Sequence, residues 1–216
     1  MRLGFHLSIA GSLLRAIKQA QVLGCQALQI FIQNPRAWKW RDLPLREIGT
    51  FVAARRIAGL GPLAVHLTYL PNLASVDPAL YQKSSERLIQ ELALARALEA
   101  DYLICHPGHA PLEMESFARV ARTLAAAVKK IPPPPLVLLE NTAGQGQELG
   151  WNQEQLGWIM RLAGVPLGLC LDTSHAFGAG YDLRHPGGVA RLLAETARGP
   201  GLDREGQPHH HLPHRA

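Results

Sequence analysis

The sequence has few cysteines and no long apolar segment. Its three cysteines, Cys25, Cys105 and Cys170, each lie within an apolar stretch, and three is an odd number. This pattern resembles reduced core thiols more than a disulfide framework, so a cytoplasmic location is expected. No uncharged apolar stretch approaches the length of a membrane span, and the N-terminus lacks the pattern of a signal peptide. We therefore expect an unprocessed protein without a membrane partner.

The totals indicate one large domain with a substantial core. Hydrophobic residues make up 47% of the 216-residue chain, which is enough to bury such a core. The chain has 22 Lys and Arg against 17 Asp and Glu, giving a net charge of +5. This excess is compatible with a polyanionic partner but does not require one.

Strand-like and helix-like patterns alternate along the chain. The expected strands are Leu3–Ser8, Ala27–Ile32, Leu63–Leu67, Tyr102–His106, Leu136–Glu140 and Leu167–Asp172. The expected helices are Leu13–Leu23, Leu45–Ala58, Ala79–Leu98, Glu115–Lys129, Gln153–Ala163 and Pro186–Ala197. Alternation of this kind predicts a parallel sheet, and strands without polar alternation are typical of burial on both faces. A doubly wound sheet has the same pattern, but we favour a TIM barrel of the α/β class.

Six strand-helix units are visible, whereas a complete barrel has eight units in about 250 residues. We therefore expect an incomplete barrel over residues 1–198. Residues 199–216 contain Gly, Pro and four histidines but almost no apolar periodicity, which predicts a disordered tail. His209, His210, His211 and His214 of this tail are assigned no role.

Four successive apolar runs end on a residue that can bind a metal: His66, His106, Glu140 and Asp172. The ends of parallel barrel strands meet at one rim, where barrel enzymes have their active sites. Imidazole and carboxylate groups bind zinc or manganese, and a carboxylate such as Glu140 can bridge two ions. His175 follows Asp172 closely and could serve a neighbouring ion. Each residue alone also has an ordinary explanation, such as a bond to a backbone carbonyl or a helix cap.

Read with their neighbours, these residues resemble the endonuclease IV family, the zinc-dependent enzymes that cut DNA at abasic sites. The resemblance spans roughly residues 4–183. The matching motifs are Gly4-Phe-His-Leu-Ser8, Asn34-Pro-Arg-Ala-Trp38, His66-Leu-Thr-Tyr-Leu-Pro-Asn72, His106-Pro-Gly108, Glu140-Asn-Thr-Ala-Gly-Gln-Gly146 and Asp172-Thr-Ser-His-Ala-Phe-Gly-Ala-Gly-Tyr-Asp182.

The resemblance implies a xylose-isomerase-like barrel with up to three zinc ions. By this similarity, His66, His106 and Glu140 hold the first ion, Glu140 bridges to a second beside Asp172, and His175 binds the third. The family's remaining ligands lie in a later His-Leu-Asn-Asp segment, an Asp-Arg-His triplet and a distal Glu, which have no counterpart here. Fewer ions, and a truncation or a change of reading frame after about Ala197, are therefore expected.

The resemblance also implies a reaction and a substrate. The family acts in base-excision repair and hydrolyses the phosphodiester 5′ to an abasic site in double-stranded DNA, leaving a 3′-hydroxyl and a 5′-deoxyribose phosphate. Glu140 is the catalytic candidate, because it could orient the attacking water. The expected DNA contacts are Arg36, Tyr69 and Leu70, which match the family's penetrating residues, and Asn34 and Gly144, which match groove residues. A monomer is expected for the family, although open barrel edges favour oligomers or aggregates.

Two other functions fit part of the pattern. A sugar isomerase or epimerase also uses a metal held by Glu, Asp and His at a barrel mouth, but a small sugar has no need for the Arg36 and Tyr69 loops. A non-catalytic remnant that binds one zinc ion or DNA weakly would follow if the missing ligands are essential.

Overall fold

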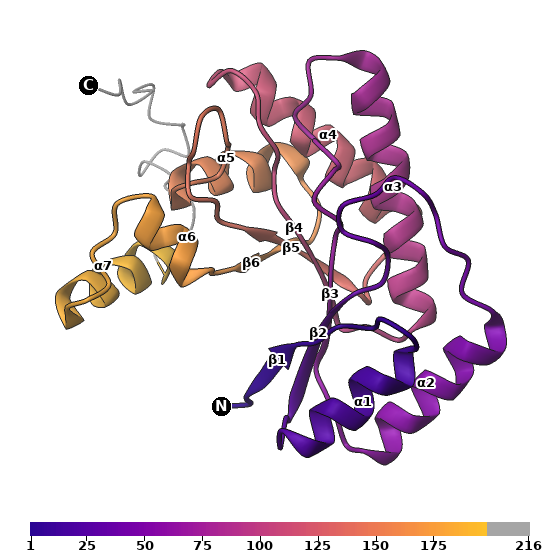
Figure 1. The fold of residues 1–216 in the computed structure, drawn as a ribbon. Coiled ribbons are helices and arrows are strands. Elements are labelled where there is room, and N and C mark those ends of the chain that lie inside the picture. The colour runs from indigo at the N-terminus through magenta and orange to yellow at the C-terminus, as the bar shows by residue number, and fades with distance from the viewer. Residues whose placement is uncertain (198–216) are drawn as a thin grey trace. The chain divides into compact units, whose positions relative to one another are not determined.

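The structure is a computed structural model that describes residues 1–197 (Figure 1). Its strands are β1 (Gly4–His6), β2 (Ala27–Phe31), β3 (Leu63–His66), β4 (Tyr102–Cys105), β5 (Leu136–Glu140) and β6 (Gly168–Cys170). Its helices are α1 (Leu13–Val22), α2 (Leu45–Ile57), α3 (Pro78–Ala97), α4 (Met114–Lys130), α5 (Gln153–Ala163), α6 (Thr173–Gly178) and α7 (Pro186–Ala197). The predicted tail with its four histidines lies outside the described residues. None of the helices in residues 1–197 is both long and apolar enough to cross a membrane.

The strands form one sheet in the order β1-β2-β3-β4-β5-β6. The pairs β1–β2, β2–β3 and β3–β4 are parallel, with Gly4 opposite Ala27, Leu28 opposite Leu63, and Ala64 opposite Tyr102. Because spatial order follows chain order, each crossover joins neighbouring strands through a helix. The described residues thus contain the predicted succession of six strand-helix units.

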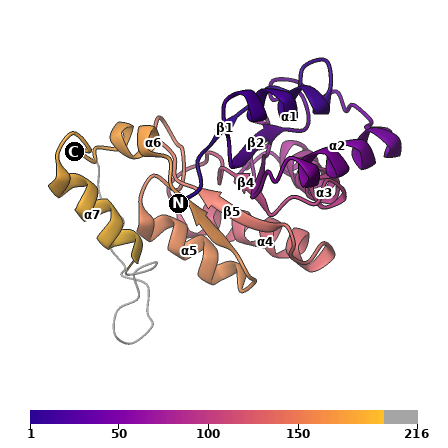
Figure 2. The same ribbon diagram turned by 90° about the horizontal axis from the view of Figure 1, so that it is seen from below.

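By its internal contacts the chain divides into two compact units, and the first comprises Met1–Pro71, Ser84–Cys105 and Ala127–Leu138. In this unit α1 packs beside α2, as both views show (Figures 1 and 2). The apolar face of α1 and the inward residues of β2 and β3 are buried: Leu13, Ala16, Ile17, Ala20, Leu28, Ile30, Leu63 and Val65. The expectation that every strand is buried on both faces is wrong for the two edge strands. All three residues of β1 are exposed and all three of β6 are half-buried, because each strand has a single neighbour in the described sheet.

The second unit comprises, among the described residues, Asn72–Lys83, His106–Ala126 and residues 139–197. Its core includes Phe117 of α4, which contacts Trp158 of α5 edge to face with ring centroids 5.1 Å apart. The bounds of α5 follow from its ends: the Asn152 side chain accepts from Gln155 N at 2.9 Å, and Gly164 closes the helix at φ 59°. The short helix α6 was not predicted. It begins where the Asp172 side chain caps it, directly after β6.

Candidate metal centre

The Glu140 carboxylate at the end of β5 has an imidazole beside each of its oxygens. His106 Nε2 lies 3.4 Å from Glu140 Oε2, and His175 Nδ1 lies 3.4 Å from Glu140 Oε1. The two imidazole rings meet edge to face at 5.3 Å. Glu140 is buried, whereas the two histidine side chains are each 31% exposed. The carboxylate is therefore the buried member of this group, and the two imidazoles are its solvent-accessible members.

Asp172 extends this group from the end of β6. Its Oδ1 accepts a hydrogen bond from His175 N at 2.8 Å, and its Oδ2 lies 3.7 Å from His175 Nδ1. Potential ligand atoms of Glu140, Asp172 and His175 all lie within 4.8 Å of one another. Asp172 thus caps α6 with one oxygen and presents the other to the cluster.

Asn141 connects the ends of β5 and β6. Its Oδ1 accepts from Asp172 N at 2.7 Å, and its Nδ2 donates to Asp172 O at 2.9 Å. Because both backbone groups of Asp172 bond to one side chain, Glu140 and Asp172 are held next to each other. The sequence prediction gave Asn141 no role. An asparagine directly after a ligand candidate, at the end of a buried strand, was the available signal.

The hydrogen bonds of His175 and His66 indicate which ring nitrogen is available to bind a metal. His175 Nδ1 lies 2.9 Å from Asn141 O, and His66 Nδ1 lies 2.6 Å from Leu67 O. A carbonyl oxygen only accepts, so in both rings Nδ1 carries the proton and Nε2 carries the lone pair. We infer from this that each ring offers Nε2 as its ligand atom. In His175 the nitrogen close to the Glu140–Asp172 pair is Nδ1, at 3.4 and 3.7 Å, so Nε2 is left for a neighbouring ion.

His66 belongs to the first unit, at the end of β3. It is buried, and its ring contacts Phe31 at 5.2 Å and Tyr69 at 5.8 Å. His6 also contacts Phe31, and its Nδ1 lies 2.9 Å from Gln29 Nε2. These contacts fix the His66 ring, and its role as a metal ligand stays a prediction.

The donor set fits a divalent metal ion. Two ligand atoms at about 2.0–2.1 Å from a tetrahedral zinc ion are about 3.3 Å apart. The distance of 3.4 Å between His106 Nε2 and Glu140 Oε2 matches this spacing. Cys170 lies nearby as a neutral thiol, because burial, and then the charges of Glu140 and Asp172, raise its pKa to about 12. The group therefore offers nitrogen and carboxylate ligands, the set that zinc and manganese accept.

The predicted DNA-contact residues of the first unit lie on two loops that are joined to each other. Asn34 and Arg36 are exposed, and Asn34 Oδ1 accepts from Arg36 N at 3.0 Å, which shapes the turn. The exposed Tyr69 donates from its backbone N to Pro35 O at 3.1 Å. A cavity of about 650 Å³ opens here, lined by residues of both loops and of the first strand and its loop, among them His6, Asn34, Pro35, Lys39, Arg41 and Tyr69. Asn34 and Tyr69 thus share one cavity.

The remaining predicted DNA contacts are less exposed. Leu70 is half-buried, beside Tyr69. Gly144, in the second unit, is buried and has φ 69° in the loop after β5, so a backbone turn requires glycine there. Contact of Leu70 and Gly144 with DNA stays a prediction.

Comparison with known proteins identifies the family. The family described as "Xylose isomerase-like TIM barrel" matches residues 17–212. "Endonuclease 4" of Thermus thermophilus is 40% identical over 207 residues, which cover 94% of this chain and 73% of the relative. The chain belongs to the endonuclease IV family. "Probable endonuclease 4" of Methanosphaerula palustris is 38% identical over 210 residues, covering 94% of this chain and 73% of that protein.

Solved structures confirm the predicted fold class. The crystal structure of an endonuclease IV from Thermus thermophilus matches with a TM-score of 0.82 and 38% identity, over 94% of this chain and 74% of that one. An L-ribulose 3-epimerase matches with a TM-score of 0.71 at 20% identity, over 90% of this chain and 67% of that one, and this likeness shows the fold alone. The endonuclease IV chain is thus an α/β protein of the xylose-isomerase-like TIM barrel class, with six strand-helix units in its described residues.

Proposed function

We propose that this chain is a metal-dependent endonuclease that cuts double-stranded DNA at abasic sites in base-excision repair. The observation that carries the proposal is the Glu140 carboxylate with His106 and His175 at 3.4 Å from its two oxygens, in a chain of the endonuclease IV family. The cut falls 5′ to the abasic nucleotide and leaves a 3′-hydroxyl and a 5′-deoxyribose phosphate.

The candidate ligands fall into sets for separate metal ions. His106 and Glu140, with the predicted ligand His66, would hold one ion; Glu140 and Asp172 would hold a second, and His175 would serve a neighbouring ion. Zinc is the expected metal, and manganese suits the same ligands. Divalent ions bound in this way activate water near neutral pH and stabilise charge on the phosphate oxygens.

The protein's own groups position the reactants. Glu140 is buried and borders the cluster, so in addition to binding metal it can accept a hydrogen bond from the attacking water. Arg36 and Tyr69 are exposed on neighbouring loops. There the Arg36 guanidinium can bind a backbone phosphate, and the Tyr69 ring can fill the gap in the base stack at an abasic site. An excess of basic residues, with a net charge of +5, favours encounter with DNA.

The test is a nicking assay on a duplex with a single abasic site, resolved on a denaturing gel. We expect nicking that stops on chelation, returns with zinc or manganese, and is absent on the intact duplex. Glu140→Gln should lower the rate at least about a thousandfold, because it removes a charged metal ligand. Glu113→Gln removes an exposed carboxylate of the same unit and serves as the matched control.

Three outcomes would contradict the proposal. Equal cutting of intact and abasic duplexes would show a non-specific nuclease. Metal-dependent epimerisation of a ketose without nicking would support the sugar enzyme. Binding of DNA without nicking, at any metal supplied, would support a non-catalytic remnant.

A further inference from the structure

Helix α3 contains a buried ion pair that the proposed chemistry does not use. The side chains of Arg87 and Glu91 are 4% and 0% exposed, and Arg87 Nη1 lies 3.9 Å from Glu91 Oε1. Both residues belong to the first unit. Burial of two charges is costly and seldom adds net stability compared with apolar residues. The pair is therefore better explained by the groups that each member holds.

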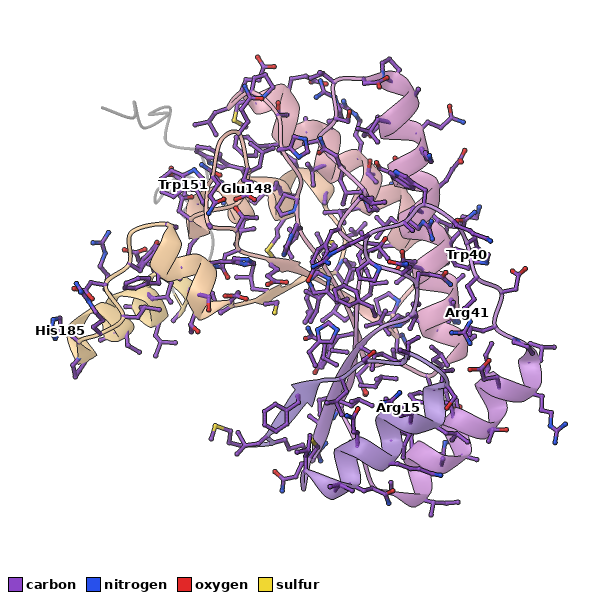
Figure 3. The ribbon with its side chains drawn as sticks, in the orientation of Figure 1. Arg15, Trp40, Arg41, Glu148, Trp151 and His185 are labelled. Carbon is purple, nitrogen blue, oxygen red and sulfur yellow. The ribbon has the colours of Figure 1, made fainter. Side chains whose placement is uncertain are left out.

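Arg87 holds the loop after β2. Its guanidinium donates from Nη2 to Trp38 O. Its Cζ lies 5.7 Å from the Trp38 ring centroid and 5.2 Å from that of Trp40, within cation–π range. Figure 3 shows Trp40 and Arg41 on the segment that runs beside α3. One side chain thus fixes this loop at a carbonyl and at two rings.

Glu91 holds the loop after β3. Thr68 Oγ1 donates to Glu91 Oε1 at 2.8 Å, and both residues are buried. The next residue, Tyr69, donates from its backbone to Pro35 O. The two loops are therefore bonded to the same turn of α3 and also to each other.

The anchors of these loops are held against α3, whereas their neighbours face solvent. Arg36 lies two residues before Trp38 and is exposed, and Tyr69 follows Thr68 and is 54% exposed. This alternation separates the residues that fix each loop from those available to a ligand. An arginine can hold the loop in this way because its planar guanidinium donates hydrogen bonds to a carbonyl along its edge and contacts aromatic rings with its faces.

We propose that Arg87 and Glu91 are positioning residues that hold the Arg36 loop and the Tyr69 loop in one preset arrangement for binding duplex DNA at an abasic site. This inference rests on the proposed function. Loops that are already held in the bound arrangement lose less conformational entropy when DNA binds. Loss of this arrangement therefore weakens DNA binding and leaves the metal ligands unchanged.

The first test follows the loops without any DNA. In protein labelled with 5-fluorotryptophan, the four tryptophans Trp38, Trp40, Trp151 and Trp158 give four ¹⁹F resonances, assigned by single Trp→Phe changes. Arg87→Met should shift or broaden the Trp38 and Trp40 resonances and leave those of Trp151 and Trp158 unchanged. Arg96→Met, which removes an exposed arginine of the same helix, should change none of them.

The second test measures DNA binding and turnover. Arg87→Met should raise the Kd for a duplex with a tetrahydrofuran abasic analogue, measured by fluorescence anisotropy in chelator, by about tenfold or more. In the nicking assay it should raise KM by a similar factor with kcat and bound zinc unchanged. The double variant Arg87→Met/Glu91→Leu removes both buried charges and should regain thermal stability. We expect it to keep the weak DNA binding, because it lacks both the bond from Arg87 to Trp38 and the bond from Thr68 to Glu91.

The results separate this inference from the proposed function. If the wild-type chain nicks abasic DNA and Arg87→Met or the double variant binds it as tightly as wild type, the positioning role is wrong and the function stands. Recovery of DNA affinity together with stability in the double variant would likewise overturn it in favour of a purely structural pair. If the wild-type chain neither prefers nor nicks abasic DNA, both proposals fail.

Discussion

Single side chains of the cluster make ordinary structural contacts as well as lying near the other candidate ligands. Asp172 caps α6 while its second oxygen lies near His175, and the Nδ1 atoms of His66 and His175 bond to backbone carbonyls. The structural and the metal-binding explanations of these residues are thus compatible, because each group has a second atom to offer. For the imidazoles, the bond from Nδ1 to a backbone carbonyl leaves Nε2 available as a ligand atom.

A first prediction, at the scale of single residues, concerns Asn141. Asn141→Ala leaves the backbone N and O of Asp172 without this partner, which should destabilise the protein by about 1–3 kcal/mol. It should also weaken zinc binding about tenfold to a hundredfold, since Asp172 is no longer held beside Glu140. Urea unfolding and calorimetric zinc titration measure the two effects. Asn152→Ala removes the α5 cap at a similar cost in stability, and equal zinc affinity in both variants would contradict this role.

A second prediction follows from the burial of Glu91, which raises its pKa from 4.5 to about 7, against the opposing effects of Thr68 and Arg87. The folded protein therefore binds this proton more tightly than the unfolded chain. The stability that this group contributes is full below about pH 4.5 and is lost as pH rises through 7. Glu91→Gln has no such loss, so from pH 5 to 8 its stability should improve relative to wild type by up to about 3 kcal/mol.

Urea unfolding at pH 5 and at pH 8, with metal removed by chelation, measures the change in the stability of Glu91→Gln relative to wild type. Glu86→Gln, an exposed site on the same helix, provides the control and should follow wild type. Parallel stability profiles of Glu91→Gln and wild type would show that Glu91 titrates normally.

The sequence predicted the ligand candidates but not the residues that hold them. His106, Glu140 and Asp172 could be predicted because each lies at or just after the end of an apolar strand, and the ends of parallel strands meet at one edge of a sheet. Arg87 and Glu91 could not be assigned partners, because a charged pair one turn apart is usual on an exposed helix face. The one available signal was their phase: they share the buried face of α3 with Leu88, Leu92 and Ala95.

At the scale of elements, the helices have clear end signals, and their bounds agree closely with the predicted ones. Helix α5 spans Gln153–Ala163 as predicted, with Asn152 before it and Gly164 after it. Helix α6 was missed because six residues are too few for a periodic pattern, and the decisive feature is the Asp172 cap. The strands are shorter than the apolar runs suggested, for example Gly168–Cys170 within the predicted Leu167–Asp172, since apolar residues such as Leu167 and Leu171 continue beyond the hydrogen-bonded ladder.

A third prediction belongs to the loop that follows His106. Gly108 has φ 102°, and a Cβ there would lie 2.2 Å from Asn72 Oδ1, whose side chain bonds to His109. Gly108→Ala should therefore destabilise the protein by about 2–3 kcal/mol. Gly49→Ala, in the interior of α2 with open space around it, should instead stabilise it by about 0.5–1 kcal/mol. The urea concentrations at the midpoints of unfolding measure both effects. A Gly108→Ala variant as stable as wild type would show that the backbone at this position is not constrained.

At the scale of the whole molecule, the fold class was predictable because alternation of strands and helices leaves few parallel topologies. What alternation cannot show is the exposure of β1, which depends on whether a strand lies on its other side. The division into two compact units was also not apparent from the sequence, since each unit is built from three separate segments and no single linker divides them. His66 and Glu140 fall in different units, and the role of His66 as a metal ligand stays a prediction.

Zinc titration of metal-stripped protein tests the central claim, that separate strands supply ligands to a shared metal centre. Wild type should bind zinc, and single His106→Ala, His175→Ala, His66→Ala and Glu140→Gln variants should each lose affinity, with Glu140→Gln weakest by about a hundredfold or more because its carboxylate touches both neighbouring imidazoles. Glu113→Gln should bind as wild type does. Zinc binding that is unchanged in Glu140→Gln would contradict the account.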